Sequence, residues 1–493
     1  MIQRALSFTI TLSIIFSLIG CAAQPNPKPN VVEGSGTIEF SSSSGNPQEA
    51  PDSIPENPPA VSSSQESQAS DSSKASSSQA SSQADPSSQS SSQAPSSSQS
   101  QSYEVVDEEE EEDGRESGGS SKVPDGEMRA VWISYLELGT MLTGKSASQY
   151  RSNIRQAVAN AARLGLNTVI LQVRPFGDAI YPSQYFPQSY LFNGTEGKLD
   201  SAPFDALEIA IDEAHDAGLR LEAWVNPYRI RSSASNKPLS SDNPAQDYLD
   251  QGGDVVIQSG SLISFNPGSK KAQDHIVDGV RELVENYDLD GIHFDDYFYP
   301  TTDASFDRDT YEQSGSGKSL AAWRRSNVTT LMGKVHEVTS SAGVRFGISP
   351  QGNNSNNLNS QYVDVEEIAQ KGYADYICPQ MYFGFQNSGC PYESTIKDFN
   401  RMVRGTGVEL YVGLATYKFG KEDTWAGSGK NEWIGTTDII ARQVETARQL
   451  SEYGGFILYR YDSTFNPDSF YSGSARAQAK TEMENLKAII GKG

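Results

Sequence analysis

Residues 276–296, IVDGVRELVENYDLDGIHFDD, contain the local pattern that decides the fold. In the first half, apolar side chains recur at the spacing of one helical face, at Ile276, Val280, Leu283 and Val284. The segment Asp288–Gly291 interrupts that pattern, and an apolar run follows it directly. The stretch therefore predicts a helix, a tight connection and then a buried strand near 290–296.

The same connection recurs along much of the chain. Seven helical segments each end close to a glycine, within residues 164–167, 217–219, 288–291, 342–344, 371–374, 406–408 and 453–455. Glycine suits a helix C-terminus because, without a Cβ atom, it adopts positive φ angles at low cost. With a leading strand, these connections predict strands near 129–134, 168–174, 219–226, 290–296, 344–349, 374–382, 409–416 and 455–461.

Strands that alternate with helices imply parallel pairing through right-handed crossovers. An open, doubly wound sheet is the competing architecture. Two features favour the closed form: residues 128–493 hold eight strand–helix units, and no glycine-rich phosphate loop follows the first strand. The sequence thus predicts an α/β fold, a (β/α)₈ TIM barrel over residues 128–493.

The N-terminus predicts export from the cytoplasm. Arg4 precedes an apolar run, Ala5 to Ile19, whose fifteen residues suit a signal peptide better than a membrane span. The run ends at Gly20-Cys21, which resembles the bacterial lipobox and implies cleavage after residue 20 and lipidation of Cys21. We expect residues 1–20 to be a lipoprotein signal peptide and the mature chain to be extracytoplasmic, lipid-anchored to the bacterial cell membrane. An ordinary signal peptide or an uncleaved anchor is the alternative.

Residues 21–127 are expected to form a disordered tether. They consist largely of Ser, Gln, Pro and Ala, and residues 107–113 are an unbroken acidic run. So few large apolar side chains cannot offset the entropy lost on folding. The segment 22–127 holds 19 acidic and 4 basic residues, and thus carries −15 of the chain's net charge of −24. The folded part is therefore mildly acidic and has no basic stripe, which argues against a nucleic-acid partner.

Two cysteines lie in the predicted barrel, Cys378 on a strand and Cys390 on the loop that follows. Outside the cell they could form one disulfide that would staple this loop, or remain two thiols. A metal centre is not expected, because two cysteines and four scattered histidines offer no group with zinc-ligand spacing. No cofactor is predicted.

Several predicted strands end in polar and aromatic residues, where the active site of such a barrel is built. Because side chains alternate along a strand, one face of strands two to four is polar: Gln172 and Arg174, then Glu222, Trp224 and Asn226, then His293 and Asp295. We expect this face to point into the barrel. The opposite face, against the helices, is expected to hold Ile170, Leu221, Ala223, Val225, Ile292 and Phe294.

Asp295 and Asp296 are the leading catalytic candidates, and Glu222 is the third. Cleavage of a glycosidic bond needs an acid to protonate the leaving oxygen and a second group to stabilise an oxocarbenium-like centre. Two adjacent carboxyl groups can serve both roles, because their repulsion raises the pKa of one of them. Alternatively, the aspartates cap a segment or pair with Arg174, and Glu222 is a buried partner of Arg174 in the barrel floor.

A second set of side chains is suited to holding a sugar. Aromatic rings stack on sugar rings, amides orient hydroxyl groups, and a guanidinium can hold a carboxylate. The predicted substrate-binding residues are Trp132, Arg174, Trp224, Asn226, His293, Tyr297, Gln380, Tyr382 and Tyr417. Taken singly, each aromatic residue could equally belong to the core, and His293 could be an ordinary hydrogen-bonded interior residue.

Together these motifs resemble glycosyl-hydrolase-like family ten. The similarity runs from about residue 128 to 465 and is carried by Arg129-Ala130-Val131-Trp132, Arg174-Pro175, Trp224-Val225-Asn226-Pro227, Phe265-Asn266-Pro267, Pro379-Gln380-Met381-Tyr382 and, most specifically, DGIHFDDYFYP at 290–300. The resemblance implies a TIM barrel and hydrolysis of O-glycosidic bonds in a cell-envelope polysaccharide, foremost a peptidoglycan-type amino-sugar glycan. The family includes bacterial lipoproteins and a glycosidase of peptide-free glycan strands. We carry no catalytic assignment over from it.

Two more distant resemblances bear on the mechanism. Family-eighteen chitinases also follow Asp-Gly with acidic residues on strand four, but Tyr297 stands where their catalytic glutamate would fall. The adjacent Asp295–Asp296 pair is instead similar to that of hexosaminidases that act on O-linked N-acetylglucosamine. There one aspartate orients the substrate's acetamido group as nucleophile and the other is the acid, which implies retention of configuration.

The sequence allows more than one function. The first is a glycoside hydrolase acting on peptidoglycan-type glycan. The second is a non-catalytic, glycan-binding surface lipoprotein, for which aromatic and amide groups would suffice. A wall esterase or deacetylase would need a metal cluster or a Ser/His/Asp set, and the sequence shows neither. The pair of aspartates favours the hydrolase.

Overall fold

The computed structural model describes residues 126–490. The expectations for the signal peptide, for Cys21 and for the tether up to residue 125 lie outside the described residues. Within 126–490, no helix is both long enough and apolar enough to cross a membrane. The first barrel strand begins at Met128.

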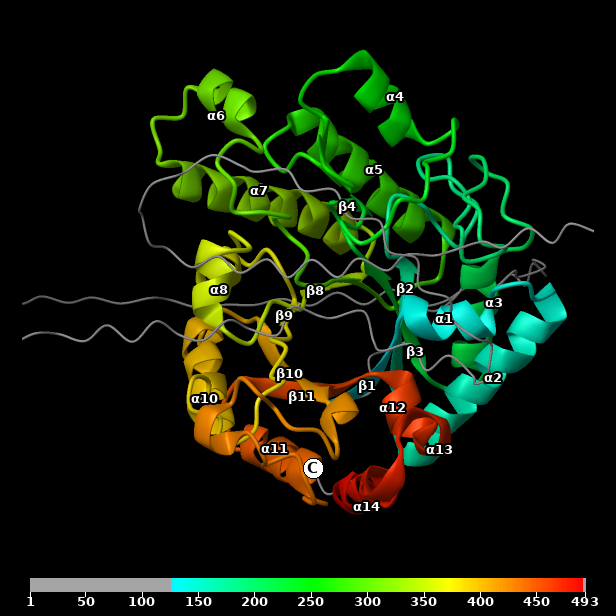
Figure 1. Ribbon diagram of the computed structural model, residues 1–493, viewed down its shortest axis with the longest axis vertical. Coiled ribbons are helices and arrows are strands. Elements are labelled where there is room, and N and C mark those ends of the chain that lie inside the picture. Colours follow the sequence, from blue (N-terminus) through cyan, green and yellow to red (C-terminus); the bar gives the residue numbers. More distant parts are fainter. Residues whose placement is uncertain (1–125, 491–493) are drawn as a thin grey trace, which may run out of the picture. The chain divides into compact units, whose positions relative to one another are not determined.

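Eight parallel strands form a closed barrel in the order β1–β11–β10–β9–β8–β7–β3–β2 (Figure 1). They are β1 (Met128–Ile133), β2 (Thr168–Arg174), β3 (Arg220–Val225), β7 (Gly291–Phe294), β8 (Arg345–Ile348), β9 (Tyr376–Ile377), β10 (Glu409–Ala415) and β11 (Tyr453–Tyr459). Each overlaps a strand expected from the sequence. Because β1 pairs with both β2 and β11, the sheet is closed, the predicted TIM barrel is confirmed and the doubly wound alternative is wrong.

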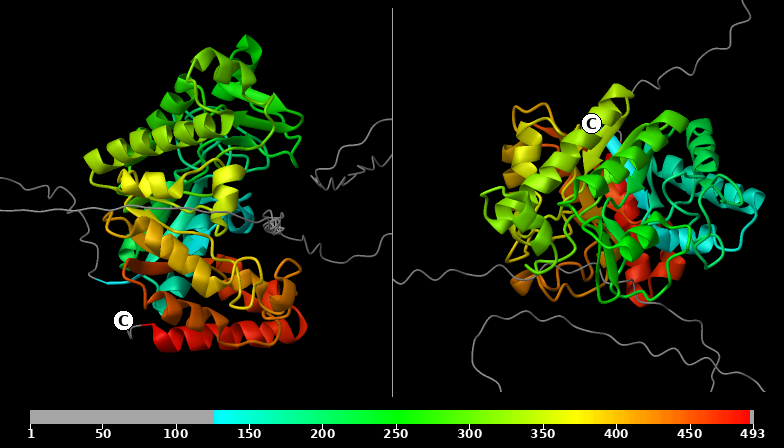
Figure 2. Two further views of the ribbon diagram at one scale, coloured as in Figure 1. Left: turned by 90° about the vertical axis from the view of Figure 1, so that its left-hand side faces the viewer. Right: turned by 90° about the horizontal axis from the view of Figure 1, so that it is seen from above.

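Helices surround the barrel, and one set of them connects successive strands (Figures 1 and 2). These are α2 (Ala147–Leu164), α3 (Ala206–Asp216), α5 (Lys270–Asn286), α7 (Leu320–Ser341), α9 (Val365–Gln370), α10 (Tyr392–Val403) and α11 (Ile439–Ala447), with α14 (Gly473–Ile489) after the last strand. Further helices lie in the loops: α1 (Tyr135–Met141), α4 (Pro244–Gln251), α6 (Arg308–Ser314), α8 (Asn354–Asn359), α12 (Tyr461–Phe465), α13 (Pro467–Phe470), η1 (Thr416–Lys418) and η2 (Gly427–Gly429). Helices α5 and α7 pack side by side.

Helix α2 shows how the sequence sets these elements. Ser146 caps its N-terminus by accepting a hydrogen bond from the Gln149 backbone N–H, and Gly165 ends it with a φ of 95°. The residues predicted to form its apolar face are all buried: Ile154, Ala157, Val158, Ala161 and Leu164. Full burial of an Ile or Leu side chain contributes roughly 1.5–3 kcal/mol, so this face fixes α2 against the barrel.

A small antiparallel sheet, which the sequence did not predict, lies in the connection between β3 and α5. Its order is β4–β6–β5, with β4 (Arg229–Arg231), β5 (Val256–Ser259) and β6 (Leu262–Phe265). Strands of three or four residues are too short to show a periodic pattern, which explains why they were missed. The sheet matters because β4 carries Arg229 close to the end of β3.

Large side chains fill the barrel interior. Trp132, Ile170, Trp224 and Tyr376 belong to one buried cluster inside the ring. The expectation that Ile170 faces the helices is wrong, because it has the same parity along β2 as Gln172 and shares its inward face. The other residues expected on the outward face pack in the outer cluster, as predicted: Leu221, Ala223, Val225, Ile292 and Phe294.

Two inward-facing glycines make room for these side chains. A Cβ atom at Gly347 would lie within 2.3 Å of three ring atoms of Tyr376, and one at Gly291 would lie 2.7 Å from the carboxyl carbon of Glu222. Both distances are far below a van der Waals contact. Tyr376 and Glu222 therefore reach their positions only because the neighbouring strands carry no side chain there.

Candidate active site

Asp295 and Asp296 directly follow β7 and lie at the C-terminal end of the barrel strands. Both side chains are buried, with 3% and 5% of their surface exposed. Burial disfavours the ionised form of a carboxyl group, and two such groups repel each other when both are charged. Burial, followed by the charge of Asp296, raises the pKa of Asp295 to about 7, and burial also raises the pKa of Asp296. The pair therefore holds a proton near neutral pH.

A chain of hydrogen bonds fixes the Asp295 carboxyl. The Tyr135 backbone N–H donates to Gln172 Oε1 (2.9 Å), and Gln172 Nε2 donates to Asn226 Oδ1 (2.7 Å). Asn226 Nδ2 then donates to Asp295 Oδ2 (2.6 Å), and the Tyr297 backbone N–H donates to Oδ1 (3.1 Å). A backbone N–H can only donate, so it sets the direction of every later bond in the chain. Because these neighbours all donate, a proton carried by Asp295 can pass to a bound ligand.

Asp296 is held from a different strand. Gln380, which follows β9, donates from Nε2 to Asp296 Oδ1 (3.0 Å) and to the Ser349 carbonyl (3.3 Å). The structure thus brings two of the predicted amides to the two carboxyls, Asn226 to Asp295 and Gln380 to Asp296. Asn226 follows β3 and Gln380 follows β9, which lie on either side of β7. The two aspartates are thus held from both sides at the C-terminal end of the barrel strands, which we call the mouth.

Arg229 is the cation whose charge acts on both carboxyls. It lowers the pKa of each, although burial raises them by more. Its guanidinium lies over the rings of Tyr297 (4.1 Å) and Phe176 (4.6 Å). No sequence pattern singled out this residue, because its position depends on the loop after β3 folding back as the short strand β4.

Arg174 forms no ion pair with either aspartate, although it was predicted to share their inward face and the charge of Asp295 acts on it. The register of β2 against β3 shifts between Gln172 and Arg174. The Arg174 guanidinium packs over Phe186 (4.3 Å), a residue of the outer cluster, and its N–H groups donate to the carbonyls of Phe176 and Pro227. It is 2% exposed and forms no ion pair among residues 126–490. The alternative in which Arg174 forms an ion pair with Asp295, Asp296 or Glu222 is therefore wrong.

Glu222 lies two side-chain layers deeper in the barrel than Asp295. On β3, Glu222 is level with Gly291 of β7, whereas Trp224 is level with His293, and Asp295 lies two residues further along. Glu222 is fully buried, and burial raises the pKa of its carboxyl. The layer that contains Trp224 and His293 thus separates it from the predicted catalytic pair. This is the barrel-floor position that the sequence left as an alternative.

A second hydrogen-bond chain ends at Glu222. Trp132 Nε1 donates to His293 Nε2 (3.1 Å), and His293 Nδ1 lies 2.8 Å from the Tyr376 hydroxyl. That hydroxyl donates to Glu222 Oε2 (2.5 Å). An indole N–H can only donate, so His293 accepts at Nε2 and carries its proton on Nδ1. Burial lowers the pKa of His293 to about 3, which keeps the ring neutral.

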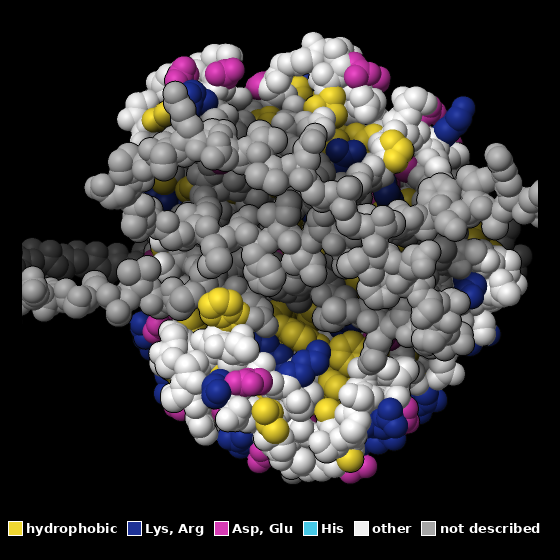
Figure 3. Space-filling model, viewed as in Figure 1, with side chains coloured by type: hydrophobic (Ala, Val, Ile, Leu, Met, Phe, Trp, Pro, Cys, Tyr) yellow, Lys and Arg dark blue, Asp and Glu magenta, His cyan; other side chains and the backbone are white. Residues whose placement is uncertain are grey.

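The predicted aromatic residues form two groups. Trp132 and Trp224 meet edge to face at 6.5 Å and are nearly fully buried. Tyr382 and Tyr417 each pack on Tyr459, at 5.5 and 5.8 Å; Tyr459 was not predicted. Hydrophobic side chains gather over β10 and β11, with Lys and Arg side chains among them (Figure 3). Tyr417 and Tyr459 are half-buried, whereas Tyr382, Trp132 and Trp224 are buried.

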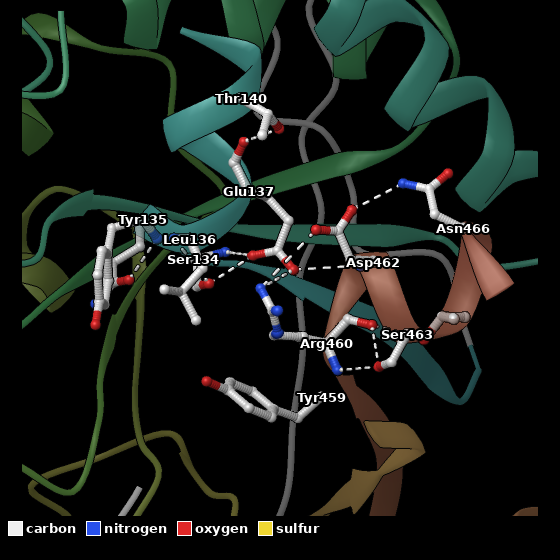
Figure 4. Close-up of polar contacts among 12 residues, drawn as sticks. Ser134, Tyr135, Leu136, Glu137, Thr140, Tyr459, Arg460, Asp462, Ser463 and Asn466 are labelled. Atoms are coloured by element: carbon white, nitrogen blue, oxygen red, sulfur yellow. Dashed lines mark hydrogen bonds and ion pairs between the residues drawn. The ribbon is translucent and has the colours of Figure 1, made fainter. Parts of the chain in front are cut away.

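Another buried carboxylate at this end of the barrel is fully paired (Figure 4). Glu137, in α1, lies 2.8 Å from Arg460, which follows β11. The Ser134 hydroxyl, the Ser134 backbone N–H and the Asp462 backbone N–H also donate to Glu137. Burial raises the pKa of Glu137, and the Arg460 charge opposes that shift. Because β1 and β11 close the barrel, we assign this pair to the fold and not to the reaction.

Cys378 and Cys390 are free thiols, so the disulfide alternative is wrong. Cys378 is buried in the cluster inside the ring, and Cys390 packs against the outer cluster. The two thiols thus belong to separate packing regions. Across the described range 126–490, no three or more His, Cys, Asp or Glu side chains are grouped so as to hold a metal ion.

A surface cavity of about 670 Å³ lies apart from these residues, between α7 and α9. Two of its lysines form ion pairs: Lys371 lies 2.9 Å from Glu367, and Lys334 lies 3.0 Å from Asp274. It contains none of the predicted site residues, and we assign it no role.

Comparison with known proteins identifies the family. Residues 127–427 match the family described as Glycosyl hydrolase-like 10. The chain belongs to this family. The resemblance expected from the sequence is therefore confirmed, and the matched range includes the pair of aspartates, the small sheet and every predicted substrate-binding residue.

Two named relatives support the same family. The chain is 33% identical over 351 residues to glycosyl hydrolase YngK of Bacillus subtilis, covering 66% of each chain. It is 35% identical over 336 residues to glycosyl hydrolase DigH of Escherichia coli, covering 62% of this chain and 74% of DigH. Among solved structures, the PgaB (BpsB) glycoside hydrolase domain from Bordetella bronchiseptica matches with a TM-score of 0.48 and 15% identity, over 72% of this chain and 98% of that one. The assignment depends on the sequence matches.

Proposed function

We propose that this chain is a glycoside hydrolase that cleaves O-glycosidic bonds of a cell-envelope polysaccharide, foremost a peptidoglycan-type amino-sugar glycan. The observation that carries the proposal is the Asp295–Asp296 pair, two adjacent buried carboxyls that hold a proton near neutral pH at the catalytic end of a TIM barrel. Membership of the Glycosyl hydrolase-like 10 family and relatives named glycosyl hydrolases support the reaction class.

In this proposal Asp295 is the acid. Its pKa near 7 lets it keep a proton, and its hydrogen-bonded neighbours donate to it, so the proton passes to the glycosidic oxygen as the bond breaks. As that bond breaks, ionised Asp296 stabilises the positive charge that develops at the anomeric carbon, directly or by orienting the substrate's acetamido oxygen. Water then adds to the anomeric carbon, and the proton that it loses returns to Asp295. Asn226 and Gln380 hold the two carboxyls in place.

The proposed sugar-binding side chains fall into two groups that differ in depth in the barrel. Tyr297, Tyr382 and Tyr417 lie at the mouth and contact the sugar rings, while Trp132, Trp224 and His293 form the floor beneath them. Arg174 and Glu222 support the barrel from buried positions, and this revises their predicted direct roles.

The location of the enzyme is also a proposal. Residues 1–20 are taken as the signal peptide, Cys21 as the lipidated residue, and 21–127 as a tether that carries the barrel domain of 128–493 away from the membrane. The lipobox-like Leu18-Ile19-Gly20-Cys21 supports this arrangement. Mass spectrometry of the mature chain tests it: a lipid-modified N-terminal cysteine is expected, and an unmodified N-terminus would contradict it.

The function is tested by incubating the mature chain with purified glycan strands, with and without stem peptides, and measuring product masses. We expect release of reducing ends by the wild type and loss of release by Asp295→Asn and Asp296→Asn. Saturable binding without any product would instead support the non-catalytic glycan-binding lipoprotein. Undiminished release by both variants would remove the pair from the mechanism.

A further inference from the structure

The loop after β8 is rich in amide side chains, and its Gln351 reaches Asp296. Gln351 is 8% exposed, and its amide donates a hydrogen bond to the Asp296 carboxyl, which lowers the pKa of that carboxyl against the effect of burial. Along the loop, asparagine or glutamine stands at positions 353, 354, 356, 357, 359 and 361. Asp296 thus has a second amide donor besides Gln380, and this donor comes from the end of a different strand.

Two neighbouring amides fix which end of the Gln351 amide faces Asp296. Asn356 Nδ2 donates to Gln351 Oε1 (3.2 Å), so the oxygen is turned toward α8. Gln361, with its amide turned so that both ends have partners, accepts from Gln351 Nε2 (3.1 Å). The Gln361 nitrogen donates to the backbone carbonyls of Asp296 (2.8 Å) and Tyr299 (3.3 Å). Because a carbonyl can only accept, these two groups set the direction of both amides, and Gln351 Nε2 keeps its second N–H for the Asp296 carboxyl.

Asn357 fixes the backbone from which the Gln351 side chain extends. The Gln351 backbone N–H donates to Asn357 Oδ1 (2.9 Å), and Asn357 Nδ2 donates to the Gln351 carbonyl (2.8 Å). Asn357 is fully buried, so water does not compete for either bond. Gln351 also pairs with Gln380 in a parallel bridge, which brings the two amide donors of Asp296 next to each other. Gln351 is therefore held at both its backbone and its amide before a substrate binds, as a group that positions another must be.

We propose that Gln351 is a positioning residue: its oriented amide N–H stabilises the ionised Asp296 carboxylate and so favours the state in which the proton of the pair is on Asp295. This inference rests on the proposed function, in which Asp295 is the acid and Asp296 the carboxylate. The physical reason is that a charged acceptor forms a stronger hydrogen bond than a neutral one, so a donor aimed at a carboxyl group favours its ionised form.

Other titratable groups lie around Asp296: Asp295 beside it, Arg229 of β4, Tyr297 after β7 and Tyr382 after β9. An arginine stays charged at any pH at which an enzyme is assayed. Burial raises the pKa of Tyr297 to about 12 and that of Tyr382 well above its ordinary value. Asp295 is therefore the neighbour that titrates together with Asp296. Loss of the first proton from the pair gives the acid limb of the pH profile, and loss of the second gives the alkaline limb.

The test is the pH dependence of kcat/KM, measured from product masses with the full mature chain and peptide-free glycan strands. Gln351→Met removes the amide donor and nearly keeps the length of the side chain. Gln361→Met, at a half-buried position, removes the amide that orients Gln351 and takes its place if the first variant does not fold. Asn353→Ala is the matched control, because this buried amide of the same loop accepts from the Ser355 backbone N–H (3.0 Å) at the start of α8.

We expect Gln351→Met to raise the acid limb by about one pH unit, the size expected for loss of one hydrogen bond to a charged group. The alkaline limb should stay in place, because Asp296 is ionised on both sides of that step. Gln361→Met should raise the acid limb by less, and Asn353→Ala should move neither limb. A profile lowered equally at every pH by Gln351→Met, or an acid limb that moves as far in Asn353→Ala, would overturn the proposal. So would an unmoved acid limb in Gln361→Met if Gln351→Met does not fold.

A second measurement separates this inference from the proposed function. If the wild type releases no product, the proposed function fails, and unfolding still decides the role of Gln351. Its hydrogen bond is stronger to a carboxylate than to a protonated carboxyl, so the denaturant midpoint of Gln351→Met should lie further below that of the wild type at about pH 8 than at about pH 4. An equal difference at both pH values would overturn the inference.

Discussion

The mouth and the floor of this barrel each contain buried carboxyl groups, but their neighbours differ in kind. At the floor, Glu222 ends a chain that begins at an indole N–H and passes through a neutral histidine and a tyrosine hydroxyl. At the mouth, Asp295 and Asp296 accept hydrogen bonds from side-chain amides and from a backbone N–H, and the charge of Asp296 raises the pKa of Asp295. The floor network is enclosed by packed rings, whereas the mouth lies where the loops of a TIM barrel meet the substrate.

The difference shows that residue type and strand face do not by themselves assign a catalytic carboxylate. Glu222, Asp295 and Asp296 all come from neighbouring strands, and Glu222 shares its inward face with Asp295. What separates them is depth along the strand, two layers of side chains in a structure whose layers are closely packed. If this comparison holds, substitutions at the mouth should alter activity, and substitutions at the floor should alter stability.

The largest effect is expected at the mouth. Asp295→Asn should lower kcat on glycan by about 10²- to 10⁴-fold, the usual contribution of a positioned acid. The free energy of unfolding should change little, because removal of a buried charge opposes the loss of one of the two oxygens that accept hydrogen bonds in Asp295. Product masses give the rate, and thermal unfolding gives the stability. A variant that loses activity and also melts far below the wild type would place Asp295 among the structural residues.

The matching change at the floor should have the opposite character. Glu222→Ala leaves a cavity next to Gly291 and removes the acceptor of the Tyr376 hydroxyl, so we expect a loss of about 2–5 kcal/mol in unfolding free energy. Glu222→Gln, which keeps the shape and an acceptor oxygen, serves as the control and should retain activity within roughly threefold. Denaturant unfolding and product assays on both variants measure this. A collapse of kcat in Glu222→Gln with normal stability would return Glu222 to the catalytic candidates.

The contrast between mouth and floor also shows which parts of the fold and the site could be predicted from the sequence and which could not. The repeated helix–glycine–strand connection predicted all eight strands and their order, because it depends on local conformation and burial. The alternation along β3 and β7 predicted that Glu222 and His293 face inward. Alternation does not tell how deep in the barrel a side chain lies, so it could not distinguish a residue at the floor from one at the mouth. Arg174 was misplaced because a shift in the β2–β3 register moved it to the outer core. Arg229 was missed because its position is set by tertiary contacts of a strand three residues long.

The pH dependence of activity and stability sharpens the comparison further. Burial and the Asp296 charge raise the pKa of Asp295 from an ordinary value of 3.8 to about 7. Between these values the folded state keeps a proton that the unfolded state has released, so the free energy of unfolding should fall by a few kcal/mol as the pH rises from about 4 to 7. Activity that depends on protonated Asp295 should also decline above about pH 7.

The control for this pH dependence is Asp295→Asn, which has no group to titrate at that position. Its unfolding free energy should fall less steeply with pH over the same interval than that of the wild type. Parallel curves for the two proteins would mean that the proton near neutrality is held elsewhere.

The smallest effect is expected from Tyr376→Phe, which removes one hydroxyl from the middle of the floor network. The variant leaves His293 Nδ1 without its acceptor and Glu222 without its donor, at a cost of roughly 1–3 kcal/mol in unfolding free energy. Tyr392→Phe is the matched control, since its buried hydroxyl donates to the Gln443 carbonyl in the outer core. Both variants should unfold more easily and keep their kcat, because neither hydroxyl contacts Asp295 or Asp296. If Tyr376→Phe alone lost tenfold or more in kcat at unchanged stability, the floor would be coupled to the mouth through Trp132, and the two regions would have to be treated as one catalytic unit.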